Sequence, residues 1–135
     1  MTDVLTPEQR HQNMSAIKSK NTKPEVIARH IIHSMGYRYR LHQKDLPGKP
    51  DLVFPKYSKV IFIHGCYWHM HNCRYGRVVP KTNAKFWKNK RESNKNRDKK
   101  NRLDLKKLGW EILTIWECQL RNLTALEKRI VAFLQ

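Results

Sequence analysis

Asp51, His64 and His69 are the side chains whose types and spacing suit the hydrolysis of a phosphodiester. Asp51 begins a short apolar run, a place where one carboxylate can hold Mg²⁺ at the edge of a sheet. His64 ends the next apolar run, His69 follows in the loop beyond it, and the backbone carbonyl of Ile63 can add an oxygen ligand. The metal would neutralise charge on the phosphate while a neutral imidazole accepts a proton from water. The alternative is that Asp51 only caps a turn and the histidines are structural.

Three cysteines and a histidine form a second group of potential metal ligands. Cys66, His71 and Cys73 lie close together in one loop, and Cys118 comes just after a predicted strand. Thiolates and imidazole are the ligands that zinc prefers, and four of them close a structural site. An odd number of cysteines without a secretion signal argues against a disulfide framework. We therefore expect structural zinc, with His69 as an alternative to His71; the competing interpretation is three ordinary buried cysteines.

Short apolar runs predict the strands that must carry these residues. Residues 52–54 and 60–63 are joined by a tight link and predict a hairpin of core strands. Residues 37–41 alternate apolar with polar side chains, as a half-buried strand does, and residues 112–116 form another apolar run. A loop rich in Cys, His and Trp follows the hairpin over residues 65–76.

Helices are predicted before, between and after these strands. Capping-box patterns, in which Thr is followed three residues later by Gln or Glu, mark helix starts at residues 6–9, 22–25 and 124–127. The first predicts an N-terminal helical arm within residues 1–20, and the second predicts a helix that ends at Gly36. A short helix around Phe86 is expected to precede a longer one from Ser93 to Gly109. This order predicts a single α/β domain over residues 1–135, a mixed sheet flanked by helices.

The charge of the chain predicts a polyanionic partner. Its 135 residues include 28 Lys and Arg against 11 Asp and Glu, a net charge of +17. Such an excess is most easily tolerated beside a polyanion that releases counterions, so nucleic acid is the expected partner and an anionic membrane surface the second choice. No apolar run approaches the ~20 residues of a spanning helix, and no signal segment is present, so we expect a soluble, cytoplasmic protein.

Aromatic residues interleaved with the basic ones are candidates for contact with bases. Tyr67, Trp68 and Trp87 can act as a wedge that unstacks a base step, at least cost where pairing is already faulty. Lys85 and Lys88 beside Trp87 favour this interpretation over a place in the core. The rest of the basic run up to residue 107 would contact phosphates without reading sequence.

Several segments resemble the very short patch repair (Vsr) endonucleases. The string VIFIHGCYWHMHNC, residues 60–73, is similar to the hallmark motif of that family. The segments NMSAIKSKNTKPE, LPGKPD, FW, the group formed by Asn94, Arg97 and Asp98, and LGW through WEC continue the match over nearly the whole chain. Ile63 stands where the family pattern has Thr, and Tyr67 where it has Phe.

The resemblance implies a Mg²⁺-dependent, strand-specific DNA endonuclease that nicks 5′ to the thymine of T·G mismatches, which arise when 5-methylcytosine deaminates. The implied fold is similar to that of type II restriction endonucleases with a structural zinc added. Double-stranded DNA with a T·G mismatch is the implied partner, with mismatch-repair proteins as further candidates. A bacterial monomer in the cytoplasm, at the nucleoid when bound to DNA, is expected.

Roles for individual residues follow from the same resemblance. Asp51 and the carbonyl of Ile63 would be the Mg²⁺ ligands. His69 would be the general base, oriented by Asp98. His64 would assist near the phosphate, Glu25 would position water, and Asn94 and Arg97 are expected on the DNA-binding surface. Cys66, His71, Cys73 and Cys118 match the zinc ligands. The competing hypothesis is a zinc-stabilised DNA-binding module without catalysis.

Overall fold

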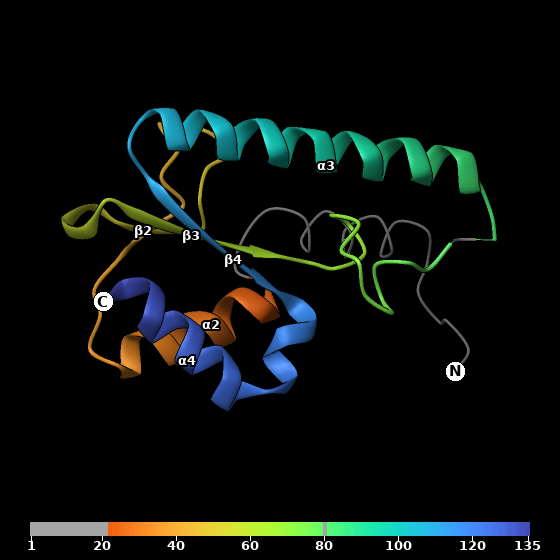
Figure 1. The fold of residues 1–135 in the computed structure, drawn as a ribbon. Helices are drawn as coiled ribbons and strands as arrows, with labels where there is room; N and C mark the ends of the chain where they lie inside the picture. Colours follow the sequence, from red (N-terminus) through yellow and green to blue (C-terminus); the bar gives the residue numbers. More distant parts are fainter. Residues whose placement is uncertain (1–21, 80) are drawn as a thin grey trace, which may run out of the picture.

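A four-stranded sheet forms the middle of three layers in the computed structural model, which describes residues 22–79 and 81–135 (Figure 1). The helices are α2 (Lys23–Ser34), α3 (Ala84–Lys107) and α4 (Leu123–Leu134). The strands are β1 (Arg40–Leu41), β2 (Leu52–Phe54), β3 (Lys59–His64) and β4 (Glu111–Trp116), with short 3₁₀ helices η1 (Pro55–Tyr57) and η2 (Glu117–Arg121). Helix α3 covers one face of the sheet, and α2 and α4 cover the other (Figure 1). The predicted mixed sheet flanked by helices is confirmed, while the predicted arm, residues 1–20, lies outside the described residues.

The topology of the sheet brings the ends of β3 and β4 together. The strands lie in the order β1-β2-β3-β4, and β2 pairs with β3 as the predicted antiparallel hairpin. Strands β3 and β4 are parallel, with His64 opposite Trp116, because α3 carries the chain back between them. The loop after β3 and the residues after β4 therefore start side by side.

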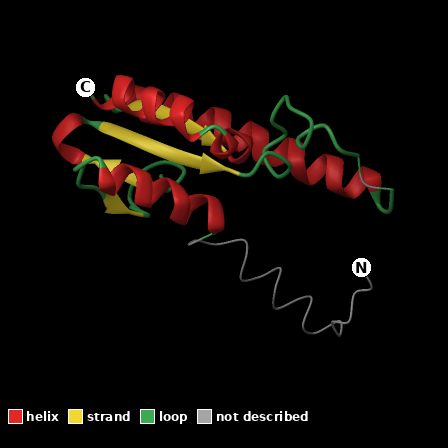
Figure 2. Ribbon diagram, turned by 90° about the horizontal axis from the view of Figure 1, so that it is seen from below, coloured by secondary structure: helices red, strands yellow, loops and turns green. Residues whose placement is uncertain are grey.

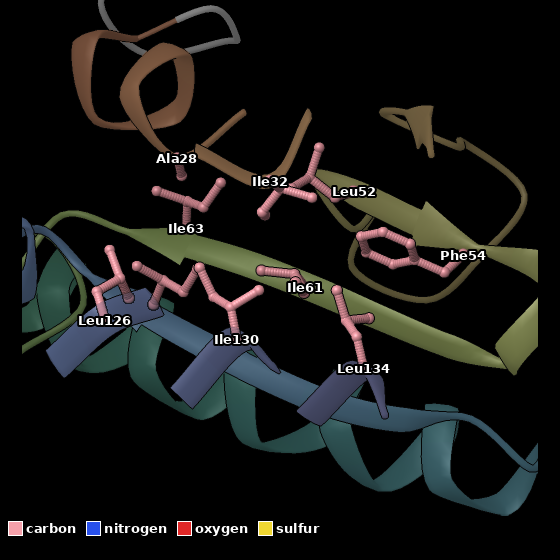
Figure 3. Packing of buried hydrophobic residues seen from close by; sticks show 10 residues of the cluster. Ala28, Ile32, Leu52, Phe54, Ile61, Ile63, Leu126, Ile130 and Leu134 are labelled. Carbon is pink, nitrogen blue, oxygen red and sulfur yellow. The ribbon is translucent and has the colours of Figure 1, made fainter. Parts of the chain in front are cut away.

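Alternation along β3 divides the core into two parts. Ile61 and Ile63 face α2 and α4, where they pack with Ile32 and Ile130 among others (Figure 3). Val60 and Phe62 point to the opposite face and pack against Leu105 of α3. Because side chains alternate along a strand, His64, two residues after Phe62, also points to the α3 face. A truncation such as Ile61→Ala would cost about 2–5 kcal/mol of stability.

Helix α3 is one continuous helix, so the prediction of two helices with a boundary near Ser93 is wrong. Its 24 residues would span about 36 Å, against about 20 Å for β3. The first half of α3 therefore extends past the sheet and lies beside the loop that follows β3 (Figures 1 and 2). Its only buried residues are Arg91 and Leu105, so the apolar periodicity that marks a helix is missing.

Three further local predictions need correction. Strand β1 is limited to Arg40 and Leu41, because Tyr37 and Tyr39 pack against the core before pairing with β2 begins. Thr22 takes the N-cap position of α2 but makes no side-chain capping bond. Helix α4 begins before the predicted Thr124, because the Asn122 side chain accepts the cap hydrogen bond from Ala125 N.

None of the helices within residues 22–79 and 81–135 combines the length and apolar character that crossing a membrane requires.

Candidate active site and Cys/His cluster

Asp51 lies at the start of β2, against the end of β3. Its Oδ2 accepts a hydrogen bond of 2.7 Å from the backbone N–H of Ile63. Because the N–H and C=O of one strand residue point to the same side, the Ile63 carbonyl faces the same edge of the sheet. The structure thus brings together the two groups predicted to bind Mg²⁺, and an Ile side chain at position 63 leaves that carbonyl available.

Glu25 reaches the same edge from α2, the helix on the face of the sheet opposite to α3 (Figure 1). Its side chain is 6% exposed and lies 2.9 Å (Oε2) from Nε2 of His42, which in turn is 4.0 Å from Asp51 Oδ1. Arg29, one turn along α2, approaches Glu25 at 3.5 Å. Potential ligand atoms of Glu25, His42 and Asp51 all lie within 4.8 Å of one another. His42 was not predicted as a site residue; the signal available was a histidine at the end of the strand predicted before LPGKPD.

Burial raises the pKa of the Asp51 carboxyl to about 8, a rise that the N–H of Ile63 opposes and nearby Glu25 reinforces. Two carboxyl groups so close in a half-buried place are stabilised by a divalent cation, which would favour the ionised form of both. The donor set at this edge, carboxylates and a strand carbonyl, therefore fits a hard cation such as Mg²⁺.

His64 ends β3 and is 7% exposed. Its ring stacks on that of His69, with centroids 3.9 Å apart and planes at 3°. Burial, reinforced by the nearby His69, lowers the pKa of His64 to about 3. Within the described part of the chain, its buried Nδ1 has no hydrogen-bond partner. His64 is therefore neutral at physiological pH, and its buried Nδ1 is left unsatisfied by the described residues.

His69 is held by Asp98 of α3, whose Oδ2 lies 2.5 Å from His69 Nδ1. An imidazole that donates its Nδ1 proton to a carboxylate presents Nε2 for proton transfer, and the carboxylate stabilises the charged ring that forms. The predicted pairing of His69 with Asp98 is thus present in the structure.

Two groups of polar side chains consequently flank the end of β3. Glu25, His42 and Asp51 gather where Asp51 contacts the backbone of Ile63. His64, His69 and Asp98 gather on the α3 face, starting at the next residue of the same strand. Asp51 and His69 are therefore linked through two consecutive residues of β3, Ile63 and His64.

The four predicted zinc ligands come together at the ends of β3 and β4. Ligand atoms of Cys66, His71, Cys73 and Cys118 lie within 4.8 Å of one another. Cys118 Sγ is 3.5 Å from His71 Nδ1, and its backbone N–H lies 3.4 Å from Cys66 Sγ. The geometry therefore selects His71 over His69, because a ring nitrogen of His71 lies among the three sulfurs, whereas His69 belongs to the separate group with His64 and Asp98.

The environment of this cluster suits a closed metal site. Burial raises the pKa of the Cys66 thiol to about 12, a value that a bound cation would lower because metals bind the thiolate. The ring of His71 stacks on Trp116 with centroids 4.1 Å apart, which fixes the direction of its Nδ1. Three sulfurs and one imidazole nitrogen match a tetrahedral zinc site without an open position.

The candidate wedge residues form a line of aromatic rings outside the two core clusters. Ring centroids are 5.1 Å apart between Tyr67 and Trp68, and 5.7 Å apart between Trp68 and Trp87. All three are half-buried, between loop and α3, while Lys85 and Lys88 on the same helix are exposed. The rings are thus partly accessible: they are neither fully buried in the core nor fully exposed.

Arg91 holds this region together through its hydrogen bonds, a role that was not predicted from the sequence. Its buried guanidinium donates to the carbonyls of Tyr67, Val78 and Gly76, and it lies 4.2 Å from the Tyr67 ring centroid. One arginine in a run of basic residues carries no sequence signal for such a role. Each carbonyl it satisfies would otherwise be costly to bury.

Asn94 and Arg97, both expected on the DNA-binding surface, make contacts within the protein. Asn94 donates from Nδ2 to the carbonyl of Trp68 at 3.2 Å, and Arg97 donates to Asn94 Oδ1. Asn94 therefore supports the aromatic line from behind, while Arg97 remains exposed. Loop and helix enclose a groove of about 750 Å³, to which Arg77, Lys85, Lys88 and Lys95 contribute basic side chains.

Comparisons with known proteins agree on one family. Residues 2–75 match the family described as DNA mismatch endonuclease Vsr. Type II nicking enzyme V.XorIIP of Xanthomonas oryzae pv. oryzae is 48% identical over 96% of this chain and 95% of its own length. V.NmeAIP of Neisseria meningitidis is 44% identical over 96% of this chain and 92% of its own. DNA mismatch endonuclease Vsr of Escherichia coli K12 is 40% identical over 90% of this chain and 78% of its own.

A solved structure supports the fold. The catalytic domain of homing endonuclease I-Bth0305I superposes with a TM-score of 0.58 at 21% identity, over 84% of this chain and 94% of its own. The sheet with helices on both faces is thus an arrangement that an endonuclease domain also has. With the family match over more than half of the chain and three relatives at 40% identity or more, this chain belongs to the Vsr family of DNA mismatch endonucleases.

Proposed function

We propose that this protein is a strand-specific, Mg²⁺-dependent nickase that cuts DNA 5′ to the thymine of T·G mismatches in very short patch repair. The observation that carries the proposal is the pairing of Asp51 with the Ile63 backbone on one side of the end of β3, and of His69 with Asp98 on the other. The 40% identity to a DNA mismatch endonuclease supports the choice of substrate.

Asp51 and the Ile63 carbonyl would hold Mg²⁺, which when bound neutralises phosphate charge and lowers the pKa of water. His69 accepts the proton of the attacking water at Nε2 while Asp98 stabilises the ring. The water oxygen bonds to phosphorus, the P–O bond to the leaving sugar oxygen breaks, and that oxygen takes up a proton from solvent. Glu25 orients water at the Asp51 edge, and neutral His64 hydrogen-bonds near the phosphate. The contact of Asp51 with Ile63, that of His69 with Asp98 and the proximity of Glu25 to Asp51 support this proposal.

Cys66, His71, Cys73 and Cys118 would hold a structural zinc ion. This site would tie the loop after β3 to η2 and so fix the position of His69 and the aromatic line. Its role is positional, because four protein ligands leave no place for substrate or water. We propose in the same way that the fold is of the restriction-endonuclease type, with this zinc site added to it.

Mismatch preference would come from insertion of Tyr67, Trp68 or Trp87 into the base stack. A mispaired step costs less to unstack than a paired one, so the same wedge gains more at a mismatch. Basic side chains of α3 and the groove would bind phosphates of both strands, with an affinity that falls steeply with salt. In the cell, the protein would act as a monomer in the cytoplasm on nucleoid DNA, in company with mismatch-repair proteins.

The test is a nicking assay on duplexes that carry one T·G pair in varied flanking sequences. With Mg²⁺, wild-type protein is expected to cut only the strand that carries the mispaired thymine. Asp51→Ala should abolish nicking and retain binding to the duplex, whereas Asp45→Ala, an exposed acid in the turn before it, should nick like wild type. If wild-type protein with Mg²⁺ leaves every T·G duplex intact, the non-catalytic DNA-binding module is the better account.

A further inference from the structure

His42 is a partly buried histidine at the Asp51 edge to which no role in the reaction has so far been given. Its Nε2 lies between the two carboxylates of the Asp51 edge, 2.9 Å from Glu25 Oε2 and 4.0 Å from Asp51 Oδ1. Its side chain is 21% exposed and that of Asp51 is 17% exposed, so both are partly open to solvent at this edge. The His42 ring therefore lies beside the position expected for the cation.

The separations of these atoms match those around one metal ion. Ligands about 2.1 Å from an octahedral ion lie about 3.0 Å apart when adjacent and about 4.2 Å apart when opposite. In this structure, His42 Nε2 and Glu25 Oε2 are 2.9 Å apart and form a hydrogen bond. This distance and the 4.0 Å to Asp51 Oδ1 also correspond to one edge and one diagonal of such an arrangement. The carbonyl of Ile63, facing the same edge, supplies a further oxygen.

The backbone holds the ring in this place. His42 has a φ of +45°, in the left-handed region that a non-glycine residue rarely adopts. Its backbone N–H donates to the carbonyl of Asp51 at 3.2 Å, so that His42 and Asp51 move together. The chain thus carries the cost of an unusual backbone conformation at the residue that points its imidazole at Glu25 and Asp51.

We propose that His42 is a side-chain ligand of the catalytic cation, together with Asp51 and with Glu25, which would orient water while it also binds the ion. This makes the site one of mixed oxygen and nitrogen ligands. The inference rests on the proposed function, since it takes the Asp51 edge as the cation site. Imidazole nitrogen binds transition-metal ions more readily than it binds Mg²⁺, which demands oxygen ligands. The site therefore accepts Mg²⁺ through its oxygens and binds Mn²⁺ more tightly, by an amount that depends on His42.

The test measures binding of Mn²⁺ and Mg²⁺ to the zinc-loaded full chain without DNA. Free Mn²⁺ is followed by electron paramagnetic resonance, and Mg²⁺ by competition. His42→Gln should weaken Mn²⁺ binding about tenfold or more and Mg²⁺ binding by clearly less. Pulsed spectra of bound Mn²⁺ should show coupling to a directly bonded ¹⁴N in wild type, and the variant should lose it. His33→Gln, an exposed histidine at the end of α2, should match wild type in every measurement.

Thermal unfolding without added Mn²⁺ checks that the variant folds. Should His42→Gln fail to fold, His42→Asn replaces it, because Asn tolerates the left-handed backbone. The inference is overturned if the variant binds Mn²⁺ and shows nitrogen coupling like wild type while Asp51→Asn loses binding; the proposed metal site then stands without His42. If Asp51→Asn also binds Mn²⁺ like wild type, the metal site of the proposed function fails as well.

Discussion

His69 Nδ1 lies 2.5 Å from Asp98 Oδ2, and this contact joins the loop after β3 to α3. Asp98 is positioned by the helix, which is anchored further along by Leu105, fully buried against the sheet. The direction of the His69 ring therefore depends on how α3 packs, and not only on the loop in which His69 lies. Asp98, an acidic residue within a basic helix, thus has a structural role as the partner of His69, 29 residues away in the sequence.

Replacing Asp98 tests this relationship. Asp98→Asn keeps the size of the side chain but removes the charge that stabilises a protonated His69 ring, so the nicking rate at saturating DNA should fall about 10²- to 10⁴-fold. Metal binding at the Asp51 edge should be unchanged, because Asp98 takes no part in it. Single-turnover nicking with excess enzyme measures the rate. Glu92→Gln, an exposed acid on the same helix, provides the control; equal rates for the two variants would exclude the assigned role.

The raised pKa of Asp51 has a consequence for stability. Its ordinary value of 3.8 rises to about 8 through burial, so between these two values the unfolded chain has lost a proton that the folded chain keeps. Without a divalent cation, stability should therefore fall as pH rises through this window. Asp51→Asn lacks the ionisable group and should lose less stability over the same range.

Thermal unfolding of both proteins at about pH 6 and about pH 8.5 measures the difference. Added Mn²⁺ or Mg²⁺ should raise the melting temperature of wild type more at the higher pH, since the ion binds the ionised carboxylate. Parallel melting temperatures for wild type and variant across the range would show that Asp51 ionises normally in the folded protein.

The sequence allowed prediction of those elements and site residues whose positions depend on adjacent residues in the chain. The core strands, the Asp51 edge and the Cys118 position after β4 follow from apolar runs and from the residue types at their ends. The pairing of His69 with Asp98, by contrast, was accessible only through the family resemblance, because nothing local connects a loop histidine to a helical acid.

Features that depend on the tertiary structure escaped prediction. His42 acquires its place through an unusual backbone conformation and the pairing of β1 with β2, and neither leaves a mark in composition. Arg91 is buried against carbonyls of a loop without regular structure. In the sequence it is one of many basic residues in the same run, and nothing distinguishes it from the exposed ones. The two-helix prediction failed for a related reason: the first half of α3 packs on that loop and needs no apolar stripe.

Loss of one ligand of the Cys/His cluster should destabilise the fold. Because metal binding contributes folding free energy, Cys118→Ala is expected to retain little zinc and to melt about 10 °C or more below wild type. Elemental analysis and thermal unfolding measure the two effects. His69→Ala removes a histidine from the same loop but outside the cluster, so it should keep its zinc while losing nicking. A wild-type content far below about one zinc per chain would contradict the site.

Removing a ring from the aromatic line should reduce mismatch discrimination more than phosphodiester cleavage itself. Base–aromatic stacking is worth about 1–3 kcal/mol, so Tyr67→Ala should lower the ratio of T·G to T·A nicking about tenfold or more. A fluorescent base beside the mismatch should brighten on binding of wild type, because it unstacks, and brighten less with the variant. Tyr57→Ala, an exposed tyrosine in η1, is the matched control, and zinc content verifies that the loop of Tyr67→Ala is intact. Unchanged discrimination together with unchanged fluorescence would assign Tyr67 to packing on Arg91 alone.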